Sequence, residues 1–318
     1  MRKMKHTLTL AATALLLAAC TQDELAEQGN ALPEGEYPLE LTANLYEAVA
    51  TPASASTRST IDGVWDANTK IAVRVNNSMV KEYIATPNAT AGSATLACPD
   101  LPEGDTDFWW TGNGQTKAVD AWCPYRVTCP TDWSVSLDQS PATMAAEGLM
   151  YATSKNFTLA NQKTQALEFK HMLAKVTINL RSSSYLTAAN EVKVTLTGQY
   201  KTGELRLNSS NTYAYIDGKS NWDNTITPYK LPSAGDGNYA SYQALVIPLD
   251  AAAAQDAQIC IEVDGTKYGY SLKTIGSTFI SGYAYTYNIT VKEEGLEVST
   301  GVSIGWNMGT GGTGEVTL

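Results

Sequence analysis

Apolar side chains recur at every second position through much of this chain, and that spacing constrains its fold more than any other feature. In residues 283–291, the side chains of Tyr, Tyr, Tyr, Ile and Val alternate with small or polar ones. A period of two places successive side chains on opposite faces of a β-strand, so each such segment has one face to bury. Long amphipathic segments with helical spacing are missing, and the sequence therefore predicts an all-β protein.

The predicted strands are short, and their spacing is typical of Greek-key β-sandwiches. Residues 259–263 and 268–272 flank Asp264-Gly265, a dipeptide that tolerates the positive φ angles of a two-residue hairpin turn. Other strands are expected at 39–45, 71–75, 82–84, 108–110, 118–122, 134–137, 192–196, 205–207, 213–215, 244–247, 296–298 and 302–306, with a short helical turn at 143–150.

One segment changes the phase of its alternation part-way along. Phe169, His171 and Leu173 share one parity, whereas the apolar side chains of residues 174–180 take the other. A regular strand cannot exchange its faces without a bulge or a change of packing environment. We therefore expect a domain boundary just before this segment, with one β-sandwich domain over 37–166 and a second over 167–318.

The first residues predict export. Arg2, Lys3 and Lys5 precede an apolar run over residues 8–19 that is too short to span a bilayer as a permanent helix. Small residues directly before Cys20 match a bacterial lipoprotein signal, in which the cysteine is lipidated and becomes the first mature residue. The alternative is an ordinary signal peptide with an incidental cysteine. We predict a lipoprotein signal peptide over 1–19 and an anchor at Cys20.

Two polar segments flank the first predicted strand. Residues 20–36 form a tether that contains Asp23-Glu24, an acidic stretch that fits either a surface-export signal or a solvated tether. Residues 51–60 have no apolar periodicity, and Arg58 is the only basic residue among them. Linkers of small polar residues are preferred sites of proteolytic nicking, so Arg58 is either a cleavage site or a solvated loop arginine.

The charge and the motifs exclude several classes of function. A formal net charge of −10 argues against binding to nucleic acid, because a basic face is needed to neutralise phosphates. His171 is the only histidine after the signal, and it lies within a predicted strand where we expect it to be buried. No phosphate-binding glycine loop or zinc-ligand spacing occurs. We predict no enzymatic activity, no metal site and no cofactor.

Four cysteines remain after Cys20: Cys98, Cys123, Cys129 and Cys260. An exported protein meets an oxidising compartment, where four thiols allow three pairings. A bridge between Cys123 and Cys129 would close a small loop, and the alternative is four unpaired thiols packed as small apolar groups.

Adjacent aromatic residues offer a binding alternative. Trp109 and Trp110 could stack on the sugar rings of a glycan, or they could fill the core of the first domain.

Four motifs together resemble the fimbrillin-like (Mfa-like) family, the subunits of type V pili and related surface lipoproteins of Gram-negative anaerobes. They are the lipoprotein signal at Cys20, the segment from Thr57-Arg58 to 71–73, the segment from Phe169 to Val176, and the segment from 281 to Trp306. Their order and spacing cover nearly the whole mature chain.

The resemblance implies two transthyretin-like β-sandwich domains and a fimbrial subunit of the outer membrane and cell surface that acts in adhesion. An arginine-specific protease would cut at Arg58 and release the first strand, whose inward residues are Leu39, Leu41, Ala43 and Leu45. Another fimbrial subunit would then donate a strand to the open groove. The C-terminal residues 302–318 are the expected donor, although glycines at 309, 311, 312 and 314 weaken strand formation there.

These features leave a second function open. A surface lipoprotein that binds a glycan or a host receptor through Trp109 and Trp110, and that never polymerises, would share the signal and the β-rich sequence.

Overall fold

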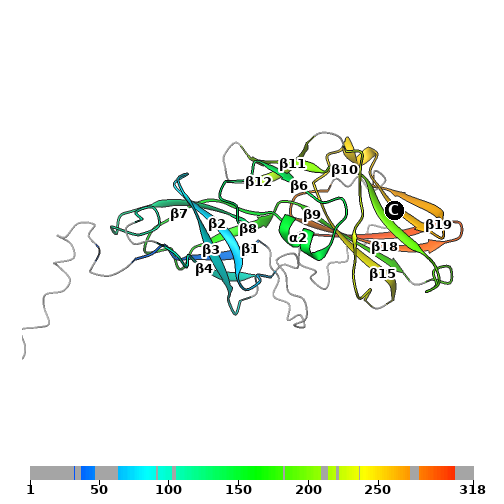
Figure 1. Cartoon of the computed structure of the whole chain (residues 1–318), viewed down its shortest axis with the longest axis horizontal. Helices are drawn as coiled ribbons and strands as arrows, with labels where there is room; N and C mark the ends of the chain where they lie inside the picture. The colour runs from blue at the N-terminus through cyan, green and yellow to red at the C-terminus, as the bar shows by residue number, and fades with distance from the viewer. Residues whose placement is uncertain are drawn as a thin grey trace, which may run out of the picture.

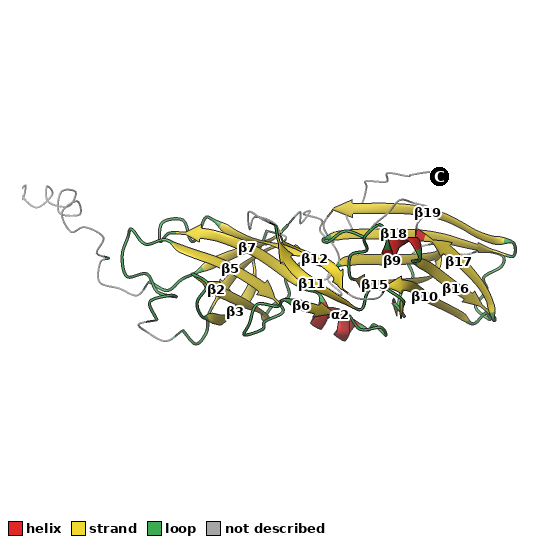
Figure 2. Cartoon of the chain, turned by 90° about the horizontal axis from the view of Figure 1, so that it is seen from above, coloured by secondary structure: helices red, strands yellow, loops and turns green. Residues whose placement is uncertain are grey.

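The computed structural model describes residues 32, 37–46, 64–90, 92–101, 105–181, 183–208, 214–219, 222–235, 237–272 and 279–304. The all-β prediction is confirmed (Figure 1). The strands gather into two bodies that follow one another along the long axis of the molecule (Figure 2). Three strands lie between them: β6 (Asp132–Ser134), β11 (Thr202–Leu207) and β12 (Ala214–Lys219).

The first body, which we call the N-terminal barrel, contains β1 (Leu41–Leu45), β2 (Thr69–Val75), β3 (Val80–Pro87), β4 (Ser93–Ala97), β5 (Lys117–Cys123), β7 (Met150–Phe157) and β8 (Ala166–His171). These strands hydrogen-bond in the closed order β1-β4-β3-β2-β5-β7-β8. Because β1 lies beside β4 and not beside β2, the first four strands form a Greek key. Parallel pairing of β1 with β8 closes the ring.

The second body, which we call the C-terminal sandwich, consists of two sheets. One has the order β14-β15-β9-β18-β19 and comprises β14 (Tyr229–Lys230), β15 (Asn238–Val246), β9 (Ala174–Arg181), β18 (Tyr283–Lys292) and β19 (Gly295–Ile304). The other has the order β13-β10-β16-β17 and comprises β13 (Asn224–Ile226), β10 (Val192–Gln199), β16 (Gln258–Val263) and β17 (Thr266–Ser271). A short 3₁₀ helix, η2 (Ala253–Gln255), precedes β16.

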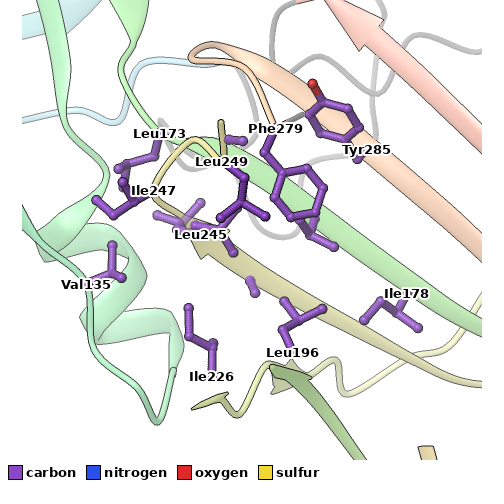
Figure 3. Packing of buried hydrophobic residues seen from close by; sticks show 14 of the residues in the cluster. Val135, Leu173, Ile178, Leu196, Ile226, Leu245, Ile247, Leu249, Phe279 and Tyr285 are labelled. Carbon is purple, nitrogen blue, oxygen red and sulfur yellow. The ribbon is translucent and has the colours of Figure 1, made fainter. Parts of the chain in front are cut away.

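The core of the sandwich lies between these two sheets. Figure 3 shows Ile178 of the larger sheet close to Leu196 and Ile226 of the smaller one. All three side chains are buried. Their alternation along each strand is the period-two pattern of the sequence, so apolar burial between the sheets explains why these segments form strands.

A segment from the first half of the sequence is built into the second body. Residues 131–149, which we call the crossing segment, lie between β5 and β7 and contain β6 (Asp132–Ser134) and α2 (Pro141–Glu147). Strand β6 joins β11 (Thr202–Leu207) and β12 (Ala214–Lys219) in a sheet of order β12-β11-β6. The crossing segment also forms backbone hydrogen bonds with Thr227, which follows β13, and thereby ties the barrel to the sandwich.

Gln139 of the crossing segment hydrogen-bonds to the edge of β15. Its side-chain Nε2 donates to the backbone oxygen of Leu245 at 2.7 Å, and its Oε1 accepts from the Leu245 backbone N–H at 2.8 Å. Gln139 is only 5% exposed. Its amide thus satisfies both polar backbone groups of one residue in β15, as a neighbouring strand would.

The strand partners change at Met172-Leu173. Strand β8 pairs with β1 and β7 of the barrel, whereas β9 pairs with β15 and β18 of the sandwich. The phase change in the sequence arises because two strands in different sheets follow each other there. We therefore propose that the domain boundary lies at Met172-Leu173, in place of the boundary expected before Leu167.

Two local predictions have different outcomes. The hairpin at Asp264-Gly265 is confirmed, because β16 pairs with β17 and these residues have φ angles of 46° and 86°. The strand predicted at 108–110 is wrong, because Trp109 makes only an isolated bridge with Pro38 after a turn.

We predict that Gln139→Ala lowers the free energy of unfolding by about 1–3 kcal/mol, because it leaves two buried backbone groups of Leu245 without partners. Chemical denaturation followed by fluorescence measures this change. The matched control is Gln255→Ala, which removes an exposed amide hydrogen-bonded only to the Ala251 backbone oxygen. Equal unfolding midpoints for the two variants would show that Gln139 does not hold the crossing segment in place.

Candidate functional site: strand β1

Strand β1 is hydrogen-bonded along both of its edges. On one side it runs antiparallel to β4, with Leu41 opposite Leu96, and on the other it runs parallel to β8, with Leu45 opposite Phe169. Because β4 and β8 do not pair with each other, β1 is the strand that closes the barrel.

The inward side chains of β1 and of the residues just before it are those expected from the sequence. Leu39, Leu41, Ala43 and Leu45 are 2%, 1%, 0% and 5% exposed, and they join the apolar core of the barrel. Burying each leucine contributes roughly 1.5–3 kcal/mol relative to exposure. The segment is therefore part of the hydrophobic core, and its loss would leave an apolar groove between β4 and β8.

Both ends of β1 are fixed by further hydrogen bonds. At the start, the backbone N–H of Leu39 donates to Phe108 at 2.8 Å, and the Tyr83 hydroxyl donates to the Leu39 oxygen at 3.1 Å. At the end, the backbone N–H of Tyr46 donates to Phe169 at 2.8 Å. These contacts align the inward residues of β1 with their pockets.

Gln162 is a positioning residue that sequence reasoning missed. Its buried Oε1 accepts from the backbone N–H of Glu40 at 3.1 Å and from the indole Nε1 of Trp110 at 2.8 Å. Gln162 thereby connects the backbone just before β1 with an aromatic ring of the barrel core. No sequence signal marks it, since an isolated glutamine in a turn is ordinarily solvated.

The structure contradicts the glycan-stacking hypothesis for Trp110. The ring is 3% exposed, lies in the barrel core and has the Lys117 ammonium 5.2 Å from its centroid. Trp109 is only partly buried but packs against the same core. A sugar cannot reach the face of Trp110, so the two tryptophans do not form a shared stacking surface.

His171 is buried at the end of β8, as expected. Its burial, with a smaller contribution from the charge of Lys175, lowers the pKa of the imidazole to about 3. The side chain therefore stays neutral at physiological pH and is not placed as an exposed general base.

The cysteines that the structure describes are all free thiols: Cys98, Cys123, Cys129 and Cys260. The bridge considered between Cys123 and Cys129 is not formed. Cys123 is 5% exposed, and burial raises the pKa of its thiol to about 12. Cys123 therefore packs as a small apolar group.

Several predicted sites fall outside the described residues. These are the lipidation site Cys20, the cleavage site Arg58 and the donor segment after Ile304. Arg58 lies in the sequence between the end of β1 and the start of β2. Within the described ranges, no group of three or more His, Cys, Asp or Glu residues could hold a metal ion, and no helix is long and apolar enough to cross a membrane.

The family model described as fimbrillin-like matches residues 57–306. The chain belongs to the fimbrillin-like family. A relative from Bacteroides uniformis, provisionally named fimbrium subunit Fim1C, is 25% identical over 98% of both chains. Solved structures support the same fold for this fimbrillin-like protein. One, from Bacteroides uniformis and provisionally described as a cell adhesion protein, has a TM-score of 0.63 and 20% identity, and covers 87% of this chain and 100% of its own.

A second such structure comes from Bacteroides ovatus and is also provisionally described as a cell adhesion protein. Its TM-score is 0.59 at 16% identity, over 85% of this chain and 98% of that one. At these identities the likeness establishes a shared fold for the fimbrillin-like chain.

We predict that Leu41→Ala destabilises the fimbrillin-like protein by about 2–5 kcal/mol, because it removes a buried leucine from the closing strand and leaves a cavity. The neighbouring Glu40→Gln removes only an exposed ion pair with Lys163 and should change stability by less than about 1 kcal/mol. Thermal and urea unfolding of both variants measures the difference. A Leu41→Ala protein as stable as Glu40→Gln would mean that β1 contributes little to the barrel.

We also predict a pH dependence that His171 controls. The unfolded chain binds a proton near the ordinary pKa of 6.5, whereas the folded state resists protonation down to about 3. The stability contribution is therefore present above pH 6.5 and is lost as the pH falls, by about 1.4 kcal/mol per pH unit. Unfolding free energies of the wild type and His171→Asn, measured from about pH 7.5 to about pH 5, should differ by this slope. Parallel curves would contradict the prediction.

Proposed function

We propose that this fimbrillin-like protein is a subunit of a cell-surface fimbrium that acts in adhesion. The fimbrillin-like model covers most of the mature chain, and the Bacteroides uniformis relative named as a fimbrium subunit matches it from end to end. The buried, neutral His171 also fits a structural role better than a catalytic one.

We propose further that subunits assemble by exchange of β1. The observation that carries this proposal is the position of β1 in the closed ring, where it alone joins β4 to β8. The chain leaving β1 runs into a segment in which Arg58 is the only basic residue before Lys70. A cut at Arg58 would end the covalent link from β1 to β2, so that β1 would be held by noncovalent contacts alone.

The energetics of exchange follow from burial. Departure of β1 would expose the pockets of three leucines and leave two backbone ladders unpaired, one on β4 and one on β8. Both losses favour refilling of the groove by another strand. Because the donor and acceptor surfaces of a subunit differ, such contacts propagate as a filament.

The position of β19 reduces the number of C-terminal residues that could act as the donor strand. We expected a donor within 302–318, but β19 runs to Ile304 and pairs with β18 along its whole length. A donor that leaves the sandwich intact would begin after Ile304. The alternative donor includes β19 itself and would expose the edge of β18 in the donating subunit.

The lipid anchor at Cys20 belongs to the same proposal. A cut at Arg58 and loss of β1 would separate the anchored segment 20–58 from the folded protein. An uncut subunit would stay on the outer membrane as a lipoprotein, and a cut one would be free to enter the fimbrium. Stable anchoring of this kind needs more than one acyl chain, as bacterial lipoproteins carry.

The test is limited digestion of the chain without its signal peptide by an arginine-specific protease. We predict a cut at Arg58, release of the segment that contains β1, and growth of oligomers visible by size-exclusion chromatography and electron microscopy. Excess synthetic peptide of residues 37–46 should suppress oligomers by occupying the groove.

The matched control is Arg58→Ala, which should remain uncut and monomeric under the same conditions. Arg206→Ala, a change at an exposed arginine in β11 that pairs with Glu204, should behave as the wild type. A protein that is cut at Arg58 and stays monomeric would overturn strand exchange, while leaving membership of the fimbrium to be tested by surface labelling.

A further inference from the structure

Strands β7 and β8 separate part-way along the barrel wall. They pair at only two positions, Met150 with His171 and Tyr151 with Lys170. Beyond these positions the strands are joined by side chains: the Lys155 ammonium donates to the Ala166 oxygen at 2.8 Å, and the Gln165 amide donates to the Asn156 oxygen at 2.9 Å. We call this region the β7–β8 seam.

A cavity of about 210 Å³ lies on the seam. Its polar lining comes from Tyr46, Tyr151, Thr153, Lys155, Glu168 and Lys170. Pockets for drug-sized ligands occupy roughly 300–1,000 Å³, so this cavity suits one small ring and not a chain of them.

The walls of the cavity are held in place before any ligand arrives. Tyr151 stacks on Trp122 with an interplanar angle of 7°, and its hydroxyl donates to the buried carboxylate of Asp120. Asp120 in turn pairs with Arg74 at 2.6 Å. On the opposite side, the Lys170 ammonium lies 4.1 Å from the centroid of Tyr46. Such fixed side chains reduce the entropy cost of binding.

The charge of the lining opposes that of the whole protein. Two lysines and one glutamate give the cavity a formal charge of +1, whereas the chain carries −10. Glu168 already interacts with Asn44 at 3.3 Å and with Lys155 at 3.9 Å. The cavity therefore favours a ligand with one negative charge.

We propose that the seam cavity binds one acidic sugar residue, a hexuronic acid at the end of a glycan. The ring of Tyr46, which is 42% exposed, suits the C–H face of a pyranose, the Thr153 hydroxyl and the Glu168 carboxylate suit its hydroxyl groups, and the lysines suit its carboxylate. This site is separate from the exchange groove. Because Tyr46 directly follows β1, the cavity is complete only while β1 remains in the barrel.

The test is ligand-observed NMR with the full chain lacking its signal peptide, using glucuronic acid, its methyl glycoside and glucose as probes. Both acidic probes should bind saturably, and glucose should bind at least about tenfold more weakly for want of the charged contact. If free glucuronic acid binds and its methyl glycoside does not, the cavity does not recognise the end of a glycan. Equal binding of glucose, or no binding of any probe, would overturn the proposal.

Two variants locate the site. Lys170→Met should weaken binding of glucuronic acid by about tenfold or more, and Thr153→Val, which keeps the side-chain shape and the charge, should weaken it severalfold. The matched control is Lys267→Met, at an exposed lysine of β17 in the sandwich, which should leave binding unchanged. If both seam variants bind as the wild type does while folding normally by circular dichroism, the ligand binds elsewhere and the proposal fails.

Discussion

The pairing of β1 with both β4 and β8 is the interaction on which the barrel depends. Without it the ring of strands has two open edges, and the pockets of Leu39, Leu41 and Leu45 face water. The hydrogen bonds and the apolar contacts act on the same short segment, so each reinforces the other. A five-residue strand is thus both essential to the closed barrel and small enough to be replaced by another of like pattern.

The crossing segment gives the molecule a second constraint. Because residues 131–149 leave the barrel, pair with β11 and return as β7, neither body can move far without breaking hydrogen bonds that include those of Gln139. The burial of Trp122 and Tyr151 in the core shared with the sandwich adds apolar contact across the junction. The barrel would therefore stay attached to the sandwich if β1 left it.

Sequence periodicity predicted most strands because it reports burial of one face, but it does not report partners. The inward residues of β1 were identified correctly, yet parallel pairing with β8, more than a hundred residues away, left no local signal. Strand β7 was missed because a bulge opposite Val119 and Ala121 breaks its alternation. Trp110 looked available for a ligand because aromatic residues serve both cores and binding sites, and only its contact with Gln162 and its burial separate the two roles.

Strand β1 contains no cysteine, so no disulfide can join it to its neighbours. A covalent staple between β1 and its neighbours would stabilise the barrel but would also prevent exchange of the strand. In the barrel, β1 is retained instead by leucine burial and by backbone ladders, both of which an incoming strand can reproduce. We expect β1 to leave slowly, because a strand that is paired on both edges must break two ladders of hydrogen bonds before it leaves. The contacts that seat β1 firmly are thus the same contacts that, in the proposed exchange, a strand from another subunit would make.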